Sequence, residues 1–163
     1  MRVGLIGFGK TGRAVASVLL DSELTQLQWV MRQSHVLEHR SVAEFLGVKS
    51  DEPALILSKA EFTAANLLDQ KPVDVIIDFS GDSGLSYYGE AAAKRGITII
   101  SAVSQYEPET KERLKALASQ TVVMHSPNIT LGINFLMISA KILKNIAPYT
   151  DIEIIEEHFK LKP

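Results

Sequence analysis

A glycine-rich turn close to the N-terminus constrains the fold of this chain more than any other feature. The apolar run Val3–Ile6 leads directly into Gly7–Gly12, which reads Gly-x-Gly-x-x-Gly, and apolar residues then recur at helical spacing from Ala14 to Leu19. A strand, this turn and a helix in that order are typical of a dinucleotide-binding unit, because the first N–H groups of the helix point toward a diphosphate. The sequence therefore predicts a phosphate cradle at Gly7–Gly12, with a plain tight turn as the alternative.

Each glycine of the turn has its own expected task. Gly7 allows the chain to turn sharply after the strand. Gly9 lets a diphosphate approach the backbone because it has no Cβ atom, and Gly12 lets the helix pack closely against the strand.

Strands and helices alternate along the first 130 residues. Short β-branched or apolar runs predict strands, and amphipathic segments of about ten residues between them predict helices. This alternation is typical of βαβ units, so we predict an α/β fold with a Rossmann-type, doubly wound parallel sheet over residues 1–130. The expected strands cover residues 2–6, 27–31, 54–57, 73–80, 97–100 and 121–124, and the expected helices cover residues 11–20, 61–68, 83–94 and 108–119.

The residue after the second expected strand indicates which dinucleotide is bound. Folds that bind NAD usually place Asp or Glu there, about 20 residues after the glycines, to hold the ribose 2′-hydroxyl. This chain has Arg32 there, followed by Ser34. A guanidinium can hold a 2′-phosphate through two hydrogen bonds, whereas a carboxylate would repel it. We therefore expect NADPH as the preferred cofactor, with NADH possible; the alternative is a solvated or adenine-stacked Arg32.

The later strands are followed by Phe79 and Ser80, by Ser101–Val103 and by Ser126–Asn128. These segments lie at the edge of the sheet where ligands of parallel α/β folds bind. We expect these residues to lie along the nicotinamide half of the cofactor. The complete set of predicted cofactor-binding residues is Gly7, Phe8, Gly9, Lys10, Thr11, Gly12, Arg32, Ser34, Phe79, Ser80, Ser101, Ala102, Val103, Ser126 and Asn128.

Two histidines suggest a metal site that the rest of the sequence does not favour. His35 and His39 lie four residues apart, a spacing that places two side chains on one face of a helix. No His-Glu-x-x-His signature accompanies them, and Glu38 is more simply interpreted as a surface charge. The chain has no cysteine, which excludes thiolate ligands. We therefore predict no metal site.

The alternation of short strands and helices ends after residue 130. We place the beginning of a second, α+β domain over residues 131–163. Ile129–Gly132 reads as a turn, Asn134–Ile146 as a strongly apolar helix, and Asp151–Glu157 alternates as a strand does. The helix carries more apolar surface than one small sheet can cover. This surplus indicates a subunit interface or a contact with a further domain.

Four segments, taken together and in this order, resemble the dihydrodipicolinate reductase family, whose members are also called 4-hydroxy-tetrahydrodipicolinate reductases. They are the glycine turn Gly7–Gly12, the strand Val75–Ser80, the segment Ser126–Asn134 (Ser-Pro-Asn-Ile-Thr-Leu-Gly-Ile-Asn) and the segment Asp151–His158 (Asp-Ile-Glu-Ile-Ile-Glu-Glu-His). The last two are the more specific, and the resemblance extends over the whole chain.

The resemblance implies a function. Members of that family reduce a cyclic dicarboxylate imine in the diaminopimelate route to lysine with NADPH or NADH, and they join a dinucleotide domain to a second domain that binds substrate and forms a tetramer. Their site motif Glu-x-His-His-x-x-Lys matches this chain at His158 and Lys162. The resemblance thus implies His158 as the proton donor, Lys162 as a donor or carboxylate clamp, and a homo-oligomer.

The chain departs from the family pattern in three places. Phe159 replaces the second histidine, Ser101–Ser104 replaces a Gly-Thr-Thr-Gly loop, and the Asp-x-Pro-Ser-Gly-Thr loop is absent together with most of the second domain. We therefore expect residues 131–163 to be the truncated beginning of a substrate domain, or the chain to be a divergent paralogue. Two other functions stay open: a non-catalytic NAD(P)-sensing module, and another two-domain dehydrogenase that shares the first half.

Composition limits the expected partners. A net charge of −2 provides no global field that would recruit nucleic acid or a membrane surface, and no apolar run is long enough to cross a bilayer. The absence of cysteine fits a reducing compartment. We expect a cytoplasmic protein whose partners are a small dicarboxylate substrate and further copies of itself.

Overall fold

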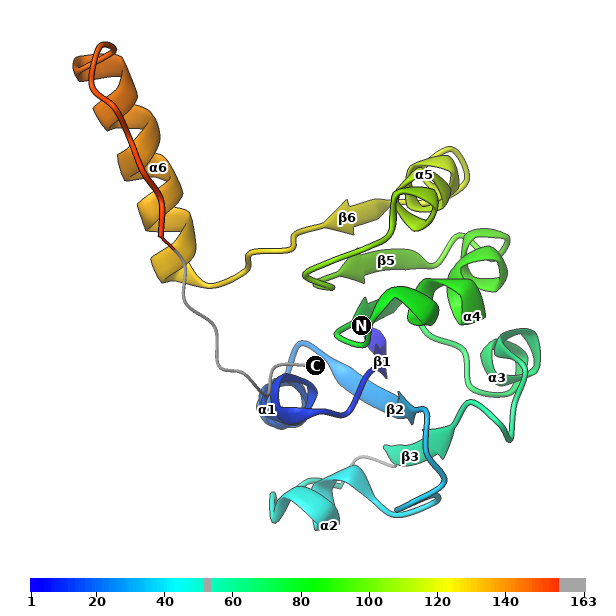
Figure 1. Cartoon of the computed structure of the whole chain (residues 1–163). Helices are drawn as coiled ribbons and strands as arrows, with labels where there is room; N and C mark the ends of the chain where they lie inside the picture. Colours follow the sequence, from blue (N-terminus) through cyan, green and yellow to red (C-terminus); the bar gives the residue numbers. More distant parts are fainter. Residues whose placement is uncertain (52–53, 156–163) are drawn as a thin grey trace. The chain divides into compact units, whose positions relative to one another are not determined.

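The computed structural model of the chain describes residues 1–51 and 54–155 (Figure 1). Contacts between Cα atoms divide the chain into two units, Met1–Pro127 and Asn128–Pro163, close to the boundary expected after residue 130. The strands are β1 (Arg2–Ile6), β2 (Gln26–Arg32), β3 (Leu55–Ser58), β4 (Val75–Asp78), β5 (Thr98–Ser101) and β6 (Val123–His125). The helices are α1 (Lys10–Asp21), α2 (Val42–Leu46), α3 (Ala64–Gln70), α4 (Asp82–Ala93), α5 (Pro108–Leu117) and α6 (Leu131–Ile146).

The six strands of the first unit form one parallel sheet, in the order β3-β2-β1-β4-β5-β6. The chain leaves the central strand β1 toward β2 and β3, returns, and continues on the other side with β4, β5 and β6. Ile6 at the end of β1 therefore pairs with Met31 of β2 on one side and with Asp78 of β4 on the other. This confirms the predicted Rossmann-type fold and places its topological switch point between β1 and β4, where such folds bind ligands.

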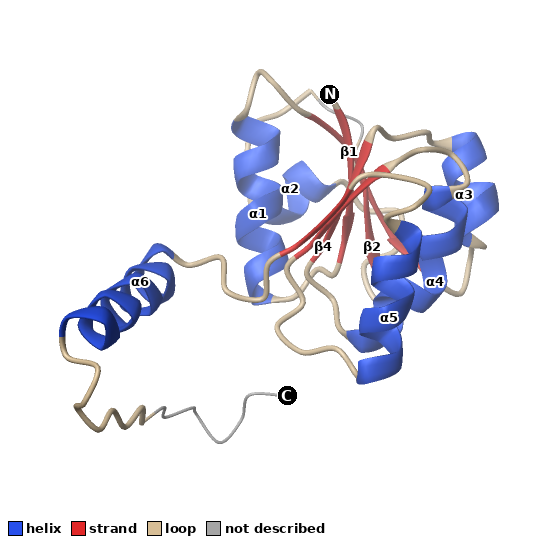
Figure 2. Cartoon of the chain, turned by 90° about the horizontal axis from the view of Figure 1, so that it is seen from above, coloured by secondary structure: helices blue, strands red, loops and turns tan. Residues whose placement is uncertain are grey.

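Helices cover both faces of the sheet, with α1 and α2 on one face and α3, α4 and α5 on the other (Figure 2). Successive residues of a strand point to opposite faces, so each strand contributes to two hydrophobic cores. Leu5 and Val30 pack in the core beneath α1 and α2, whereas Ile6 and Met31 pack in the core beneath the other three helices. Burial on both faces explains why the strands read as nearly continuous apolar runs.

Capping residues determine several helix boundaries that the spacing of apolar residues in the sequence predicts only approximately. Helix α3 begins at Ala64 rather than at Glu61, because the Oγ1 atom of Thr63 accepts a hydrogen bond from the N–H of Asn66 over 3.2 Å. Helix α2 ends at Leu46 and is capped by Gly47, which adopts a left-handed φ of 69°. The predicted strand over residues 73–80 is shorter, because the chain turns after Asp78.

The second unit differs from two predictions. The segment Ile129–Gly132, expected as a turn, contains the start of α6 at Leu131, because the side-chain amide of Asn134 donates to the carbonyls of Asn128 and Thr130 and holds the first turn. The predicted strand Asp151–Glu157 is wrong over residues 151–155, which form no strand; its last two residues lie outside the described ranges. A strand needs a neighbour to complete its backbone hydrogen bonds, and the described part of this unit contains no other strand.

No helix within residues 1–51 and 54–155 is long and apolar enough to cross a membrane.

Candidate functional site

The turn between β1 and α1 has the geometry that its three glycines predict. Gly7 has a φ of 95°, in the left-handed region, and its N–H donates to the carbonyl of Met31 over 2.9 Å. A Cβ atom on Gly12 would overlap the carbonyl oxygen of Gly7, so the helix approaches the turn too closely for a side chain. By contrast, nothing lies within 4 Å of the position that a Cβ atom of Gly9 would occupy. The turn is tightly packed at Gly12 and open at Gly9.

A cavity of about 510 Å³ lies at this turn and follows the carboxyl ends of β1, β2, β3 and β4. It includes the switch point between β1 and β4, together with the N-terminal ends of α1 and α4. The lining residues are Gly7, Phe8, Gly9, Arg13, Met31, Arg32, Gln33, Ser34, Lys59, Ser80, Gly81 and Ser83. Six of the predicted cofactor residues are therefore brought together, namely Gly7, Phe8, Gly9, Arg32, Ser34 and Ser80.

The charges around the cavity all have one sign. Arg13, Arg32 and Lys59 line it, and no carboxylate of the described residues does. The guanidinium carbon of Arg13 lies 5.7 and 5.0 Å from the ring centroids of Phe8 and Phe45. These aromatic contacts hold the cation at the cavity without neutralising it. The cavity is consequently suited to a ligand that carries several negative charges.

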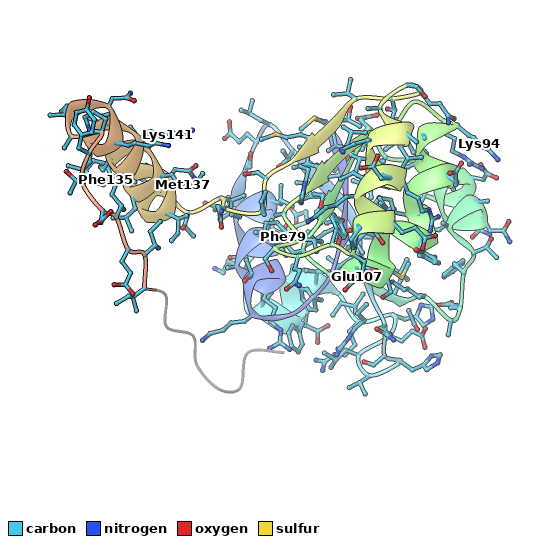
Figure 3. The ribbon with its side chains drawn as sticks, turned by 45° about the horizontal axis from the view of Figure 1, so that its top comes forward. Phe79, Lys94, Glu107, Phe135, Met137 and Lys141 are labelled. Carbon is cyan, nitrogen blue, oxygen red and sulfur yellow. The ribbon has the colours of Figure 1, made fainter. Side chains whose placement is uncertain are left out.

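Nine predicted cofactor residues do not line this cavity. Lys10 and Thr11 are exposed in the first turn of α1, and Phe79 is half-buried in the connection between β4 and α4 (Figure 3). The hydroxyl of Ser101 is buried and forms a hydrogen bond with the hydroxyl of Tyr106 over 2.8 Å, so its side chain is already engaged. The remaining five are Gly12, which is buried in the turn; Ala102 and Val103, which follow β5; Ser126, which follows β6; and Asn128, which belongs to the second unit.

A buried carboxylate fixes the loop that follows β4. Asp78 is fully buried, and its Oδ1 atom accepts hydrogen bonds from the N–H of Ser80 over 2.8 Å and from the hydroxyl of Ser80 over 2.5 Å. Its Oδ2 atom accepts the hydroxyl of Tyr88 over 2.9 Å. Burial raises the pKa of Asp78 above its ordinary value, against the hydrogen bonds from Ser80 and Tyr88, which lower it. The network holds Ser80 at the edge of the cavity.

Replacing Asp78 with asparagine is expected to remove a pH dependence of stability. Because the pKa of Asp78 is raised on folding, the folded state binds more protons than the unfolded state above the ordinary value of 3.8, and stability falls as pH rises through the folded pKa. Asparagine keeps an oxygen for Ser80 but does not titrate. Chemical denaturation between about pH 4 and pH 8 should show the variant gaining stability relative to wild type as pH rises. Parallel pH profiles would refute the assignment.

The histidine pair does not share a helix face. Residues 35–39 form turns in which Leu37 and His39 have positive φ angles of 73° and 61°. His35 Nδ1 lies 3.3 Å from a carboxylate oxygen of Glu38, and His39 Nε2 lies 3.0 Å from one of Glu61. Glu38, expected as a surface charge, has a side chain only 21% exposed. One nitrogen or oxygen atom of each of Glu38, His39 and Glu61 lies within 4.8 Å of the others, and each histidine has one carboxylate as its neighbour.

Two of the three cations that line the cavity, Arg13 and Lys59, are not among the cofactor-binding residues predicted from the sequence. Arg13 directly follows the last glycine of the turn, which could have identified it. Lys59 directly follows β3, and Arg32 is the last residue of β2. Lys59 belongs to the same site as Arg32 only because β3 pairs with β2. The predicted catalytic residues His158 and Lys162, and the substituted Phe159, lie outside the described residues.

The chain is similar in sequence to a known family of proteins. Residues 1–129 match the family model described as dihydrodipicolinate reductase, N-terminus. The 4-hydroxy-tetrahydrodipicolinate reductase of Syntrophus aciditrophicus (strain SB) is 27% identical over 158 residues, which cover 96% of this chain and 56% of the relative. The enzyme of the same name from Anaeromyxobacter sp. (strain Fw109-5) is 32% identical over 90 residues, which cover 55% of this chain and 34% of the relative. The chain thus spans well under two thirds of these relatives.

Solved structures show the same fold at low sequence identity. A dipicolinate-bound dihydrodipicolinate reductase from Paenisporosarcina sp. TG-14 superposes with a TM-score of 0.65 at 16% identity, covering 88% of this chain and 53% of that one. RSP, a Rex-family repressor, superposes with a TM-score of 0.58 at 12% identity, covering 89% of this chain and 60% of that one.

At these identities the two structures support the fold alone, whereas the family model covers most of the chain. Its match begins at the first residue and includes the glycine turn, the whole parallel sheet and the cavity residues. The chain therefore belongs to the dihydrodipicolinate reductase family, and residues 1–129 correspond to the family's N-terminal domain.

Proposed function

We propose that the cavity at the glycine turn binds NADPH, and that the chain supplies the cofactor-binding part of a reductase acting on a cyclic dicarboxylate imine. The observation that carries the proposal is the lining of the cavity. Arg13, Arg32 and Lys59 face it beside an open glycine backbone, and no described carboxylate does. The names of the relatives, 4-hydroxy-tetrahydrodipicolinate reductases, support the substrate class.

The glycine turn fits a diphosphate. The space beside Gly9 is open, so oxygen atoms can approach the backbone there. Gly9 is also the N-cap residue of α1, and no side chain caps the free N–H groups of the first turn. Those groups and the positive end of the helix dipole favour an anion at this position. Lys10 and Thr11, exposed in the same turn, can add further donors.

The end of β2 fits an adenosine ribose that carries a 2′-phosphate. Arg32 and Ser34 line the cavity there, and one N–H of the Arg32 guanidinium donates to the carbonyl of Val36 over 2.9 Å. This bond orients the guanidinium and leaves its other donors for a phosphate. The 2′-hydroxyl of NADH is neutral and would interact with a cation much more weakly than a 2′-phosphate does. We therefore infer a preference for NADPH over NADH.

The nicotinamide half would lie along the ends of β4, β5 and β6. Backbone hydrogen bonds tie these ends together: the N–H of Ala102 donates to the carbonyl of Asp78, and the N–H of Ser126 donates to that of Ser101, each over 2.9 Å. Because the hydroxyl of Ser101 is engaged by Tyr106, we expect Ser101–Val103 to contact the ring through backbone atoms.

The reaction needs a hydride and a proton. When bound, NADPH would supply the hydride, and the protonated imidazole of His158 would donate the proton, since imidazole groups titrate near neutral pH. Lys162 would hold a substrate carboxylate. In keeping with the family, we propose that the active assembly is a homo-oligomer.

Replacing His158 with glutamine, in a version of the chain joined to the remaining second domain of a relative, tests the catalytic part of this proposal. Oxidation of NADPH in the presence of 4-hydroxy-tetrahydrodipicolinate is expected to fall about 100-fold or more, because general acid catalysis contributes roughly that factor. The Kd for NADPH should stay unchanged. Equal turnover by both proteins would remove His158 from its role. If NADPH binds but is not oxidised with this substrate, even when the chain is joined to the remaining second domain of a relative, a sensing module is the better description.

A further inference from the structure

Lys59 lies beside Arg32 although 27 positions separate them in the sequence. Strand β3 pairs with β2 so that Ser58 is opposite Arg32, and the N–H of Lys59 donates to the carbonyl of Arg32 over 3.0 Å. Both side chains line the same cavity. The ends of two neighbouring strands therefore present two cations to one space.

The ammonium group of Lys59 has an unusual environment for a surface lysine. It is partly buried, and it lies 5.6 Å from the ring centroid of Tyr87. Among the described residues it forms no salt bridge, in contrast to Arg2, Arg95 and Lys115, which pair with carboxylates at 2.7 Å. The carboxylate of Asp78 acts on it electrostatically, but the oxygens of that group already accept hydrogen bonds from Ser80 and Tyr88.

This environment disfavours the charged form of Lys59. Burial lowers the pKa of Lys59, and the attraction of Asp78 opposes this effect only in part. A cation that is partly removed from water and lacks a salt bridge reduces the stability of the folded state at neutral pH. An anionic ligand would supply the missing partner, which is a pattern expected at a binding site rather than at a structural ion pair.

We propose that Lys59 and Arg32 together clamp the 2′-phosphate of NADPH, which makes Lys59 a second specificity-determining residue. The inference rests on the proposed function of the cavity. Its geometric basis is the strand order: the diphosphate would lie beyond β1, and β3 is two strands away from β1. At about 4.8 Å per strand the end of β3 is roughly 10 Å from that position, but it adjoins the end of β2, where the ribose is expected.

Replacing Lys59 with methionine in the full chain tests the clamp. Methionine keeps an unbranched, flexible apolar side chain against Tyr87 and removes the charged ammonium group. The Kd for NADPH is expected to rise about tenfold, in line with the loss of one charge-assisted contact. The Kd for NADH should change less than twofold. The midpoint of thermal unfolding should not fall, because a partly buried charge has been removed, and a merely structural role would lower it.

The matched control is Lys94→Met, which alters an exposed lysine just after the end of α4 (Figure 3). It should leave both dissociation constants unchanged. The wild-type titrations test the proposed function separately: if neither nucleotide binds, both proposals fail. If wild type binds NADPH and NADH but Lys59→Met weakens both equally, or weakens neither, the clamp is wrong while the cofactor site stands.

Discussion

Replacing Gly9 with alanine is expected to lower the affinity for NADPH at least tenfold while leaving the free energy of unfolding within about 1 kcal/mol of wild type. Gly9 has φ −76° and ψ −165°, which an alanine adopts without strain, and its added Cβ atom would meet no protein atom within 4 Å. That Cβ atom would instead occupy space that the diphosphate needs. The effect should therefore appear in the binding of the ligand and not in the stability of the fold.

Gly12→Ala is the matched variant with the opposite expected result. Its Cβ atom would overlap the carbonyl oxygen of Gly7, which is backbone and moves only if the turn moves. We expect a loss of about 1–3 kcal/mol in the free energy of unfolding, as for other overpacked sites. Urea denaturation and NADPH titration of both variants separate the two effects. If Gly9→Ala binds NADPH as tightly as wild type, the diphosphate does not lie at this turn.

Replacing Arg32 with aspartate is expected to reverse the cofactor preference. NADPH should lose about 100-fold in affinity, because a charge-assisted contact of roughly 1.5–3 kcal/mol is lost and the new carboxylate repels the 2′-phosphate. NADH should bind about as well as before or better, since a carboxylate at the end of β2 can accept the ribose hydroxyl. Parallel titrations of NADPH and NADH at one ionic strength measure the change.

Arg32→Gln is the control for this reversal, because Arg32 also has a local role. Its guanidinium donates to the carbonyl of Val36 and so supports the loop after β2. Glutamine retains a donor for that carbonyl but carries no charge, so it should weaken NADPH less than aspartate does. A loss of NADPH and NADH affinity to the same extent in both variants would show that Arg32 only supports the loop.

The fold could be predicted from the sequence because its signals are local. Each buried strand is a short apolar run, several of the breaks between elements contain glycine or proline, and the glycine turn fixes the first βαβ unit. The failures occurred where distant or side-chain contacts decide the outcome. The start of α6 depends on the amide of Asn134, and the conformation of residues 35–39 depends partly on a hydrogen bond from the N–H of His39 to the carbonyl of Ile56.

For the same reason, only some of the residues of the site could be predicted from the sequence. Gly7, Gly9 and Arg32 occur at fixed spacings within one βαβ unit, so the sequence identifies them. Lys59 becomes part of the cavity only through the pairing of β3 with β2, and no spacing rule marks it. Asp78 lies within the predicted strand over residues 73–80, but its burial against Tyr88 follows from the packing of α4.

The most direct test of the cofactor site is a titration of the isotopically labelled chain with NADPH, followed through its backbone amide resonances. The account predicts saturable shifts that are largest for Gly7, Gly9 and Arg13 at the turn and for Arg32 and Lys59 at the ends of β2 and β3. NADH should shift the first group and affect the second much less. The absence of shifts at saturating NADPH, or shifts confined to residues away from the cavity, would contradict the assignment of this cavity as the dinucleotide site.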